Sequence, residues 1–146
     1  MLERPFQIVQ FDEQYLDQVV NINWTCLPEN YGAFFFLDLH KQFPKTFLIA
    51  LADGKVAGYI MCRIEVGFSE SGRLGLTRKG HVVSLAVLPE FRRLGIGEAL
   101  LSGALDGMLD HKAKEAYLEV RVSNQAAIEL YEKFGFEPRR RIADYY

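Results

Sequence analysis

Two apolar runs, residues 46–52 and 55–67, are separated by only two residues, Asp53 and Gly54. An Asp-Gly pair between such runs is a strong signal for a tight hairpin turn, because both central positions of that turn require a positive φ. The sequence therefore predicts an antiparallel pair of strands near the middle of the chain. Every other predicted element has to be arranged around this pair.

Helical spacing and turn residues divide the rest of the chain into short elements. Asp12 is a suitable N-cap for a first helix, and Pro28 and Pro44 mark the ends of two helices, since proline cannot continue a helix. Residues 68–79 contain glycines and mixed charges, which indicates a connection between strands. The predicted elements, in chain order, are a strand over 6–11, a helix from 12 to 27, a helix over 33–43, strands over 46–52, 55–67 and 81–87, a helix through 96–108, a strand over 116–122, a helix over 124–134 and a last strand from 136. This order predicts one α/β domain over residues 1–146, with a mixed, mostly antiparallel sheet flanked by helices.

The chain is long enough for one packed core and too short for two ordinary domains, with 146 residues of which 49% are hydrophobic. Its 17 Lys and Arg against 19 Asp and Glu leave no global basic field for nucleic acid or an anionic membrane. The longest uncharged apolar run, residues 56–62, is far below the roughly 20 residues that span a bilayer. The polar N-terminus does not match a secretory signal, and Cys26 and Cys62 have no CxxC partner. We therefore expect a cytoplasmic protein with reduced thiols.

A loop rich in arginine and glycine, residues 87–97, joins a predicted strand to a predicted helix. Gly95 and Gly97 allow the backbone to approach a ligand closely, and Arg92 and Arg93 can donate charge-assisted hydrogen bonds. With the free N–H groups of the first helical turn, the loop suits an anion such as a pyrophosphate. It lacks the Lys-Ser/Thr of a P-loop and the third glycine of a dinucleotide fold. The same residues also suit a merely structural turn.

Several separated segments together resemble one family. Residues 92–97, Arg-Arg-Leu-Gly-Ile-Gly, match the Arg/Gln-x-x-Gly-x-Gly/Ala pattern of the acetyl-CoA loop in the GNAT (general-control-related N-acetyltransferase) superfamily. The preceding Ser-Leu-Ala-Val, residues 84–87, resembles the strand that leads into that loop. Residues 117–124 and 127–136, and the Leu-Pro-Glu-Asn-Tyr of residues 27–31, resemble the branch that acetylates protein N-termini.

The resemblance implies an acetyltransferase of that branch, with acetyl-CoA as acetyl donor and coenzyme A as product. Pantetheine would lie along the strand edge at 85–87 and the pyrophosphate on the loop at 92–97, with the Tyr131 hydroxyl near the sulfur as general acid. Asn124 and Lys133 would contact pantetheine and phosphates. The residues expected to contact the cofactor are Leu85, Ala86, Val87, Arg92, Arg93, Leu94, Gly95, Ile96, Gly97, Glu98, Asn124, Tyr131 and Lys133. No metal is expected, because the three histidines have no metal-ligand spacing.

The reaction needs one group that takes a proton from the amine and another that returns a proton to the departing thiolate. His81 and Glu119 are the candidates for the base, because an imidazole and a carboxylate that face one cleft can relay a proton. Which of the two acts first stays open. Each candidate also has an ordinary structural interpretation: His81 as a strand-end residue bonded to backbone, Glu119 as a solvated carboxylate, and Tyr131 as a core residue.

The resemblance further implies that Glu29 and Tyr31 grip the first residues of a protein or peptide N-terminus, although an ordinary surface loop would show the same pattern. Relatives continue past a Tyr-Tyr pair into one more strand, and Tyr145 and Tyr146 are assigned to the substrate side. This chain stops at that pair, so either the final strand lies outside the sequence or it is supplied in another way.

Two other functions fit the same residues. One is acetylation of a small amine or a lysine side chain on the same fold, and the other is a non-catalytic module that binds coenzyme A or a partner protein. The three arginines at 139–141 indicate a solvated strand end or a ribosome contact. An auxiliary subunit is a further candidate partner, whereas no nucleic-acid or membrane partner is expected.

Overall fold

The computed structural model describes residues 5–69 and 75–138, which form a five-stranded sheet with helices on both faces. The strands are β1 (Gln7–Gln10), β2 (Phe47–Ala52), β3 (Lys55–Phe68), β4 (Leu76–Val87) and β5 (Glu115–Leu118). The α-helices are α1 (Leu16–Cys26), α2 (Ala33–Gln42), α3 (Ile96–Asp110) and α4 (Gln125–Lys133). Short 3₁₀ segments cover Glu13–Tyr15, Pro44–Thr46 and Pro89–Phe91. The expectation of an α/β fold with a mostly antiparallel sheet is confirmed.

The strands lie in the order β1-β2-β3-β4-β5, and each pairing is antiparallel except that of β4 with β5, which is parallel. The predicted hairpin joins β2 to β3, and its turn residues Asp53 and Gly54 have φ of 52° and 77°. These positive values are those that an Asp-Gly turn supplies most easily. The connection from β4 to β5 contains α3, as a parallel crossover requires.

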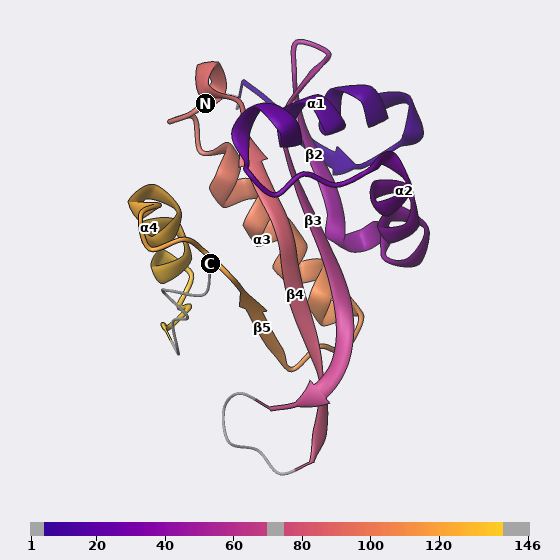
Figure 1. Ribbon diagram of the computed structural model, residues 1–146, viewed down its shortest axis with the longest axis vertical. Coiled ribbons are helices and arrows are strands. Elements are labelled where there is room, and N and C mark those ends of the chain that lie inside the picture. The colour runs from indigo at the N-terminus through magenta and orange to yellow at the C-terminus, as the bar shows by residue number, and fades with distance from the viewer. Residues whose placement is uncertain (1–4, 70–74, 139–146) are drawn as a thin grey trace.

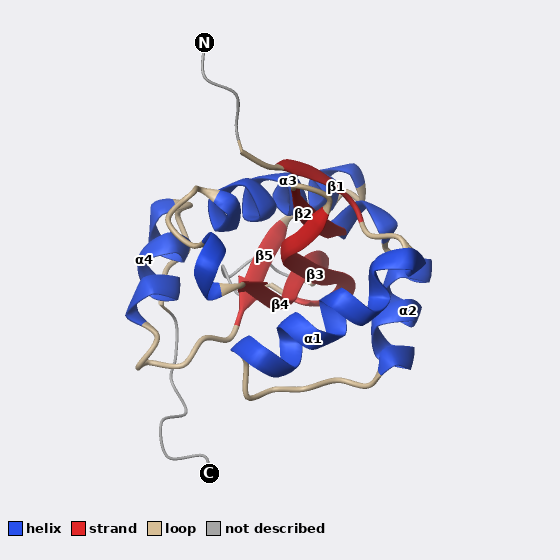
Figure 2. Cartoon of the chain, turned by 90° about the horizontal axis from the view of Figure 1, so that it is seen from above, coloured by secondary structure: helices blue, strands red, loops and turns tan. Residues whose placement is uncertain are grey.

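Helices α1 and α2 cover one face of the sheet and α3 covers the other (Figure 1). Figure 2 shows the sheet from above, between α3 on one side and α1 on the other. Alternate residues of β2 point to the two faces, so Leu48 packs in the α3 layer while Phe47 and Ile49 pack in the α1 and α2 layer. Two hydrophobic layers therefore hold the sheet in place.

Helix α3 lies very close to the sheet along the side that its glycines expose. A Cβ atom added at Gly103 would lie 2.7 Å from Leu48 Cδ1, and one at Gly107 would collide with the backbone carbonyl of Lys45. These two glycines therefore permit the close approach of α3 to the sheet and to the segment before it. The interior of this layer has no room for a side chain at either position.

Strand boundaries differ from the predicted ones at both ends of the β4–β5 pairing. Strand β4 begins at Leu76, so residues 76–79 are paired with β3 and are not part of a connection. Cross-strand pairing outweighs the weak strand propensity of these polar residues. Strand β5 ends at Leu118 instead of residue 122, because pairing with β4 stops there. Glu119 therefore follows the end of β5 and does not lie at a strand centre.

The C-terminal part of the described chain holds α4, with Asn124 as its N-cap and Gly135 in the left-handed conformation at φ 90°. The helix predicted over residues 124–134 is confirmed over Gln125–Lys133. Residues 136–138 have no regular structure, so the strand predicted from Phe136 does not begin there. Its remaining residues, 139–146, lie outside the described residues.

The two cysteines are both free thiols. Cys62 is buried in the α3 layer, whereas Cys26 is only half-buried at the end of α1. The thiol of Cys62 is therefore shielded from solvent, and that of Cys26 only in part. Across the described ranges, every helix is too short or too polar to cross a bilayer.

Candidate active site

Strand β4 has an open edge beyond Val82. It pairs with β3 along its whole length, but with β5 only over residues 79–82. Within the described residues, the backbone of residues 83–87 therefore has no strand partner on the side of β5. The two strands separate toward this end of β4 in Figure 1. Leu85, Ala86 and Val87, which were expected to hold pantetheine, form this edge.

The loop that follows is shaped by two residues with positive φ. Gly95 is the N-cap of α3 at φ 86°, and Arg93 adopts φ 67°. No side chain caps α3, and the first amide that bonds back to the turn is that of Ala99, which donates to the Gly95 carbonyl at 3.1 Å. The amides of the first helical turn are thus available to an anion, together with the helix dipole. Arg92 Nε donates to the Val87 carbonyl at 3.0 Å and ties the loop to the end of β4.

Helix α4 lies across from the start of α3. A Cβ atom at Gly97 would lie 3.4 Å from Leu130 Cδ2, and Lys133 Nζ lies 2.6 Å from Glu98 Oε1. Glu98 and Lys133, both expected at the cofactor, are thus paired with each other between the two helices. Asn124 Oδ1 accepts a hydrogen bond from the Ala127 amide and acts as a helix cap.

His81 and Glu119 are brought together as predicted. His81 Nε2 lies 2.8 Å from Glu119 Oε1, and the His81 side chain is 10% exposed whereas that of Glu119 is 76% exposed. His81 is bonded through side chains and not through backbone, which contradicts its ordinary structural interpretation. The pair joins a shielded imidazole to a carboxylate that solvent and substrate can reach.

Three residues that the sequence did not indicate complete this cluster. Glu65 Oε2 lies 3.2 Å from His81 Nδ1 and accepts a hydrogen bond from Arg63 Nε at 2.7 Å. The Tyr117 hydroxyl donates to the other oxygen of Glu65, and its ring stacks on His81 with centroids 4.4 Å apart. The alternation of Arg63 and Glu65 along a strand was the available signal, but it does not reveal the partner on the next strand.

These contacts alter the acidity of two of the groups. Burial alone would raise the pKa of Glu65, but hydrogen bonds from Tyr117 and Arg63 and the nearby His81 lower it below its usual value. Burial, the hydrogen bond to Glu65 and the charges of Glu65 and Glu119 raise the pKa of Tyr117 far above its usual value. At neutral pH, Glu65 is therefore an ionised acceptor and Tyr117 a neutral donor.

Tyr131 is the one buried residue of α4 among the described residues, and it packs in the α3 layer. Burial, with a smaller contribution from Cys62, raises the pKa of Tyr131 to about 12. The hydroxyl thus keeps its proton at neutral pH, as a general acid must. In the described residues it makes no hydrogen bond to the pair formed by His81 and Glu119, so it belongs to a separate part of the site.

The loop between α1 and α2 lies on the same side as Glu119. Glu29 Oε2 accepts a hydrogen bond from Arg121 Nη2 at 2.7 Å, which joins the loop to the segment after β5. Burial, followed by the charges of Glu29 and Glu119, raises the pKa of Tyr31. Tyr31 therefore lies within electrostatic reach of Glu119, and Glu29 contacts the residue two positions after it. Tyr145 and Tyr146, also assigned to the substrate, lie outside the described residues.

Asn23 of α1 positions this loop through hydrogen bonds of its side chain. Its side-chain amide donates to the Glu29 carbonyl at 3.0 Å and to the Tyr59 hydroxyl at 3.1 Å, and its oxygen accepts from the Tyr31 amide at 3.1 Å. The Tyr59 hydroxyl in turn lies 2.6 Å from Ser84 Oγ on β4. A buried polar network thus connects the loop to the central strands.

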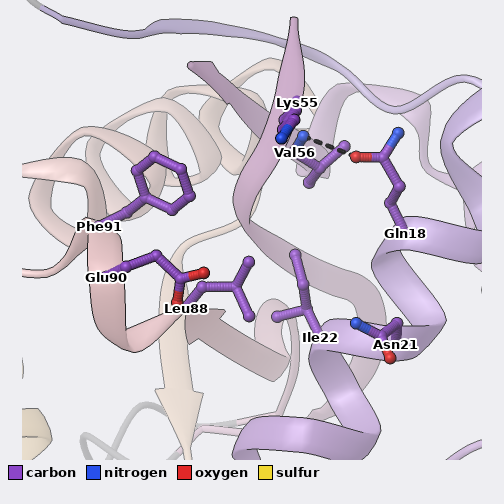
Figure 3. A pocket seen from close by; sticks show the side chains of 8 residues that line it. All are labelled: Gln18, Asn21, Ile22, Lys55, Val56, Leu88, Glu90 and Phe91. Atoms are coloured by element: carbon purple, nitrogen blue, oxygen red, sulfur yellow. Dashed lines mark hydrogen bonds between the residues drawn. The ribbon is translucent and has the colours of Figure 1, made fainter. Parts of the chain in front are cut away.

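A separate pocket of about 180 Å³ lies between α1, the start of β3 and the segment after β4 (Figure 3). Gln18 and Ile22 line it from α1, and Gln18 Oε1 accepts a hydrogen bond from the Val56 amide at 2.9 Å. The pocket is smaller than the roughly 300 Å³ at which small-molecule sites begin. It shares no lining residue with the site described above.

Comparisons with known proteins agree with this geometry. Residues 16–136 match the acetyltransferase (GNAT) family. The chain is 50% identical over 133 residues to an N-alpha-acetyltransferase of Sulfurisphaera tokodaii, covering 90% of this chain and 80% of that protein. An Arabidopsis thaliana Naa50 structure in complex with a bisubstrate analogue, CoA-Ac-MVNAL, is 29% identical with a TM-score of 0.78, covering 97% of this chain and 89% of that one. The NatC complex bound to Gag peptide and CoA gives 25% identity and a TM-score of 0.84, covering 97% and 90%. The predicted family is confirmed: the chain belongs to the GNAT acetyltransferase family.

Proposed function

We propose that this protein transfers an acetyl group from acetyl-CoA to the α-amino group of protein N-termini, by direct attack in a ternary complex. The observation that carries the proposal is the contact between His81, which lies on β4, and Glu119, which follows the end of β5. This contact lies immediately before the open edge of β4, which begins after Val82. It provides a proton acceptor at the point where a thioester can enter the sheet. The relative that is 50% identical carries the name N-alpha-acetyltransferase, which supports this substrate class.

The strength of the base suits an N-terminal amine. An α-amino group with a pKa of about 7.7 to 8.0 costs roughly 1 kcal/mol to deprotonate at pH 7, whereas a lysine at about 10.4 costs roughly 4.6 kcal/mol. A histidine paired with a carboxylate is a strong enough base to meet the smaller of these two deprotonation costs. We therefore place N-terminal amines ahead of lysine side chains as substrates.

The residues of the chain divide the proton transfers between them. The α-ammonium loses a proton to the pair of His81 and Glu119, and the freed nitrogen attacks the thioester carbonyl carbon. The C–S bond breaks, and the thiolate takes a proton from the Tyr131 hydroxyl. The acylated nitrogen releases its second surplus proton, so that one proton restores Tyr131 and the other leaves to solvent.

Acetyl-CoA would lie along two backbone features of the chain. The open edge of β4 at residues 83–87 fits pantetheine, because an extended amide chain can take the hydrogen bonds that β5 leaves unmade. The start of α3 fits the pyrophosphate, with amides of residues 95–98 and the charges of Arg92 and Arg93. The remaining cofactor contacts are assigned to Leu94, Glu98, Asn124 and Lys133.

Glu29 and Tyr31 would hold the first residues of the peptide, and Tyr145 and Tyr146 stay a prediction for the same side. A neighbouring structure is that of a complex, NatC, so an auxiliary subunit is a reasonable partner for this chain as well. A ribosome contact and a cytoplasmic location also stay predictions.

A substrate series with product mapping tests the proposal. The protein is incubated with acetyl-CoA and matched peptides that begin with Ser, Ala or Met, with the same peptides blocked at the N-terminus but carrying lysine, and with free polyamines. We expect mass spectrometry to place the acetyl group on the free N-terminus. His81→Ala should lower kcat more than it raises the peptide KM.

Two results would contradict the proposal. Preference for lysine or polyamines over every free N-terminus would show the wrong substrate class. Tight binding of acetyl-CoA without any transfer by the wild-type protein would favour a non-catalytic module. Glu119→Gln separates binding from catalysis. We expect this variant to bind acetyl-CoA as the wild type does and to lose the acetylation that the wild type shows.

A further inference from the structure

A row of side chains crosses three adjacent strands beside the pair formed by His81 and Glu119, the proposed proton acceptor. Arg63 of β3 is paired with His81 of β4, and His81 is paired with Tyr117 of β5. Glu65 lies two residues beyond Arg63, so its side chain projects from the same face of the sheet. The strand register thus places one carboxylate against the side of His81 that faces away from Glu119.

This arrangement leaves His81 between two carboxylates. Its Nδ1 lies 3.2 Å from Glu65 and its Nε2 lies 2.8 Å from Glu119. Glu65 is held as an acceptor by Arg63 and Tyr117, whose N–H and O–H groups both donate to it. An ionised carboxylate has no hydrogen to offer, so Nδ1 is the donor in the contact with Glu65. The contact of Nε2 with Glu119 needs a hydrogen on Nε2 in the same way, so the two contacts together belong to a ring that carries both hydrogens.

We propose that Glu65 is a positioning residue: it keeps a hydrogen of His81 on Nδ1, so that Nε2 is the nitrogen that takes the proton of the incoming amine and then donates it to Glu119. This inference rests on the proposed function, in which His81 and Glu119 form the base. Glu65 acts only through His81 and does not touch the substrate. The stacked ring of Tyr117 keeps the imidazole plane parallel to its own, with an angle of 3° between them.

The charge of Glu65 lies beside Nδ1 of His81. A carboxylate next to an imidazole favours the protonated ring in general, so removing this charge is expected to alter the pH profile of the reaction. The charged or titratable groups that face the cluster come from β3, β4, β5 and the α1–α2 loop. They are Arg63, Glu65, Lys79, Tyr117, Glu119 and Tyr31. Among these, Glu65 is the carboxylate that faces Nδ1.

Glu65→Gln tests the inference, because an amide keeps the size of the side chain but removes its charge and can donate to Nδ1. We expect kcat to fall about tenfold or more, the peptide KM to stay within about twofold, and the acidic midpoint of kcat/KM to move to lower pH. Glu65→Asp keeps the charge and should return the midpoint toward the wild-type value. Glu129→Gln, an exposed carboxylate on α4, is the control and should change neither quantity.

Two further measurements separate positioning from a general structural effect. In a His81→Ala background, Glu65→Gln should cause no further loss of kcat, since its effect passes through the imidazole. Nitrogen-15 NMR of the wild-type ring, assigned by comparison with His81→Ala, should show hydrogen on Nδ1. Because this measurement uses the wild-type protein, it tests the inference even if the Glu65→Gln variant does not fold.

Three outcomes would overturn the inference. The first is a neutral His81 ring with its hydrogen on Nε2 in the wild type. The second is a Glu65→Gln variant with wild-type kcat and midpoint. The third is an equal further loss in the His81→Ala background. A wild-type protein without N-terminal acetylation would instead refute the proposed function, so the two failures are distinguishable.

Discussion

At the scale of single residues, burial decides which groups can act as acids. The hydroxyl of Tyr131 lies in the α3 layer, and its burial raises its pKa to about 12. Such a hydroxyl stays protonated around pH 8, where an N-terminal amine becomes free. In the proposed reaction it is the group that returns a proton to the departing thiolate. The same burial makes the residue part of the core.

Tyr131→Phe should lower kcat by about 10²-fold, because the ring still packs but the proton donor is lost. A group with a pKa near 12 acts while protonated, so activity should show no alkaline loss from Tyr131 below about pH 11. Steady-state kinetics from pH 6 to about 10 measure both effects. Tyr15→Phe, outside the site, is the control. An unchanged kcat in Tyr131→Phe would exclude the role of general acid.

The pairing of His81 with Glu119 could be predicted from the sequence, but the rest of the cluster could not. The sequence analysis expected His81 and Glu119 to face one cleft. Glu65 and Tyr117 reach His81 only through the cross-strand register, which shifts between Met61 and Cys62 of β3 because Val83 of β4 has no partner there. A shift of one residue moves every following side chain relative to its neighbours, and local sequence does not reveal it.

At the scale of elements, α1 supports the loop that joins it to α2. Asn23 is fully buried and joins the Glu29 carbonyl, the Tyr31 amide and the Tyr59 hydroxyl. The loop has no regular structure of its own between α1 and α2. Its shape therefore depends on this amide together with the Asn30 side chain, which donates to the Leu27 carbonyl at 2.9 Å.

Asn23→Ala should raise the peptide KM more than it lowers kcat, because it releases the loop and leaves the base intact. It should also lower the free energy of unfolding by about 1 to 3 kcal/mol, since it leaves buried polar partners unpaired. Peptide kinetics and urea unfolding measure the two effects. Asn21→Ala is the matched control, the same change at an exposed position of the same helix. Equal KM values in both variants would argue against a supporting role for Asn23.

Local signals predicted most elements, and pairing determined where they end. Asp53-Gly54 and the prolines at 28 and 44 act on their immediate neighbours, and the hairpin and helix ends they predict are present. The start of β4 at Leu76 depends on a long β3 beside it, and the end of β5 depends on where β4 departs. Such boundaries are set by distant segments and are weakly encoded locally.

At the scale of the whole molecule, the fold has a well-packed part and a lightly attached part. Helices α1, α2 and α3 are packed on β1 to β4 by two hydrophobic layers. Helix α4 buries Tyr131, contacts the start of α3 near Gly97 and forms the ion pair between Lys133 and Glu98. A ligand between α3 and α4 would join these two parts.

Acetyl-CoA should therefore stabilise the folded protein. At 100 times its Kd it should raise the free energy of unfolding by about 2.7 kcal/mol, which appears as a higher melting temperature. Gly97→Ala should keep this effect, because its Cβ meets Leu130 at an ordinary 3.4 Å. Gly97→Trp should abolish it, since an indole would fill the space expected for the pyrophosphate. Thermal unfolding with and without acetyl-CoA measures all three proteins. An undiminished shift in Gly97→Trp would remove the loop from the cofactor site.

The part of β4 that extends beyond its pairing with β5 affects how the protein behaves without a ligand. Among residues 5–69 and 75–138, no strand pairs with β4 beyond Val82 on the side of β5, so the backbone donors and acceptors of that edge face outward. Any extended polypeptide can add to such a border, and uncovered borders of this kind promote self-association and aggregation. The acetyl donor would thus serve as a cover as well as a reactant. Purification and storage with coenzyme A in the buffer would keep this border occupied and the molecules apart.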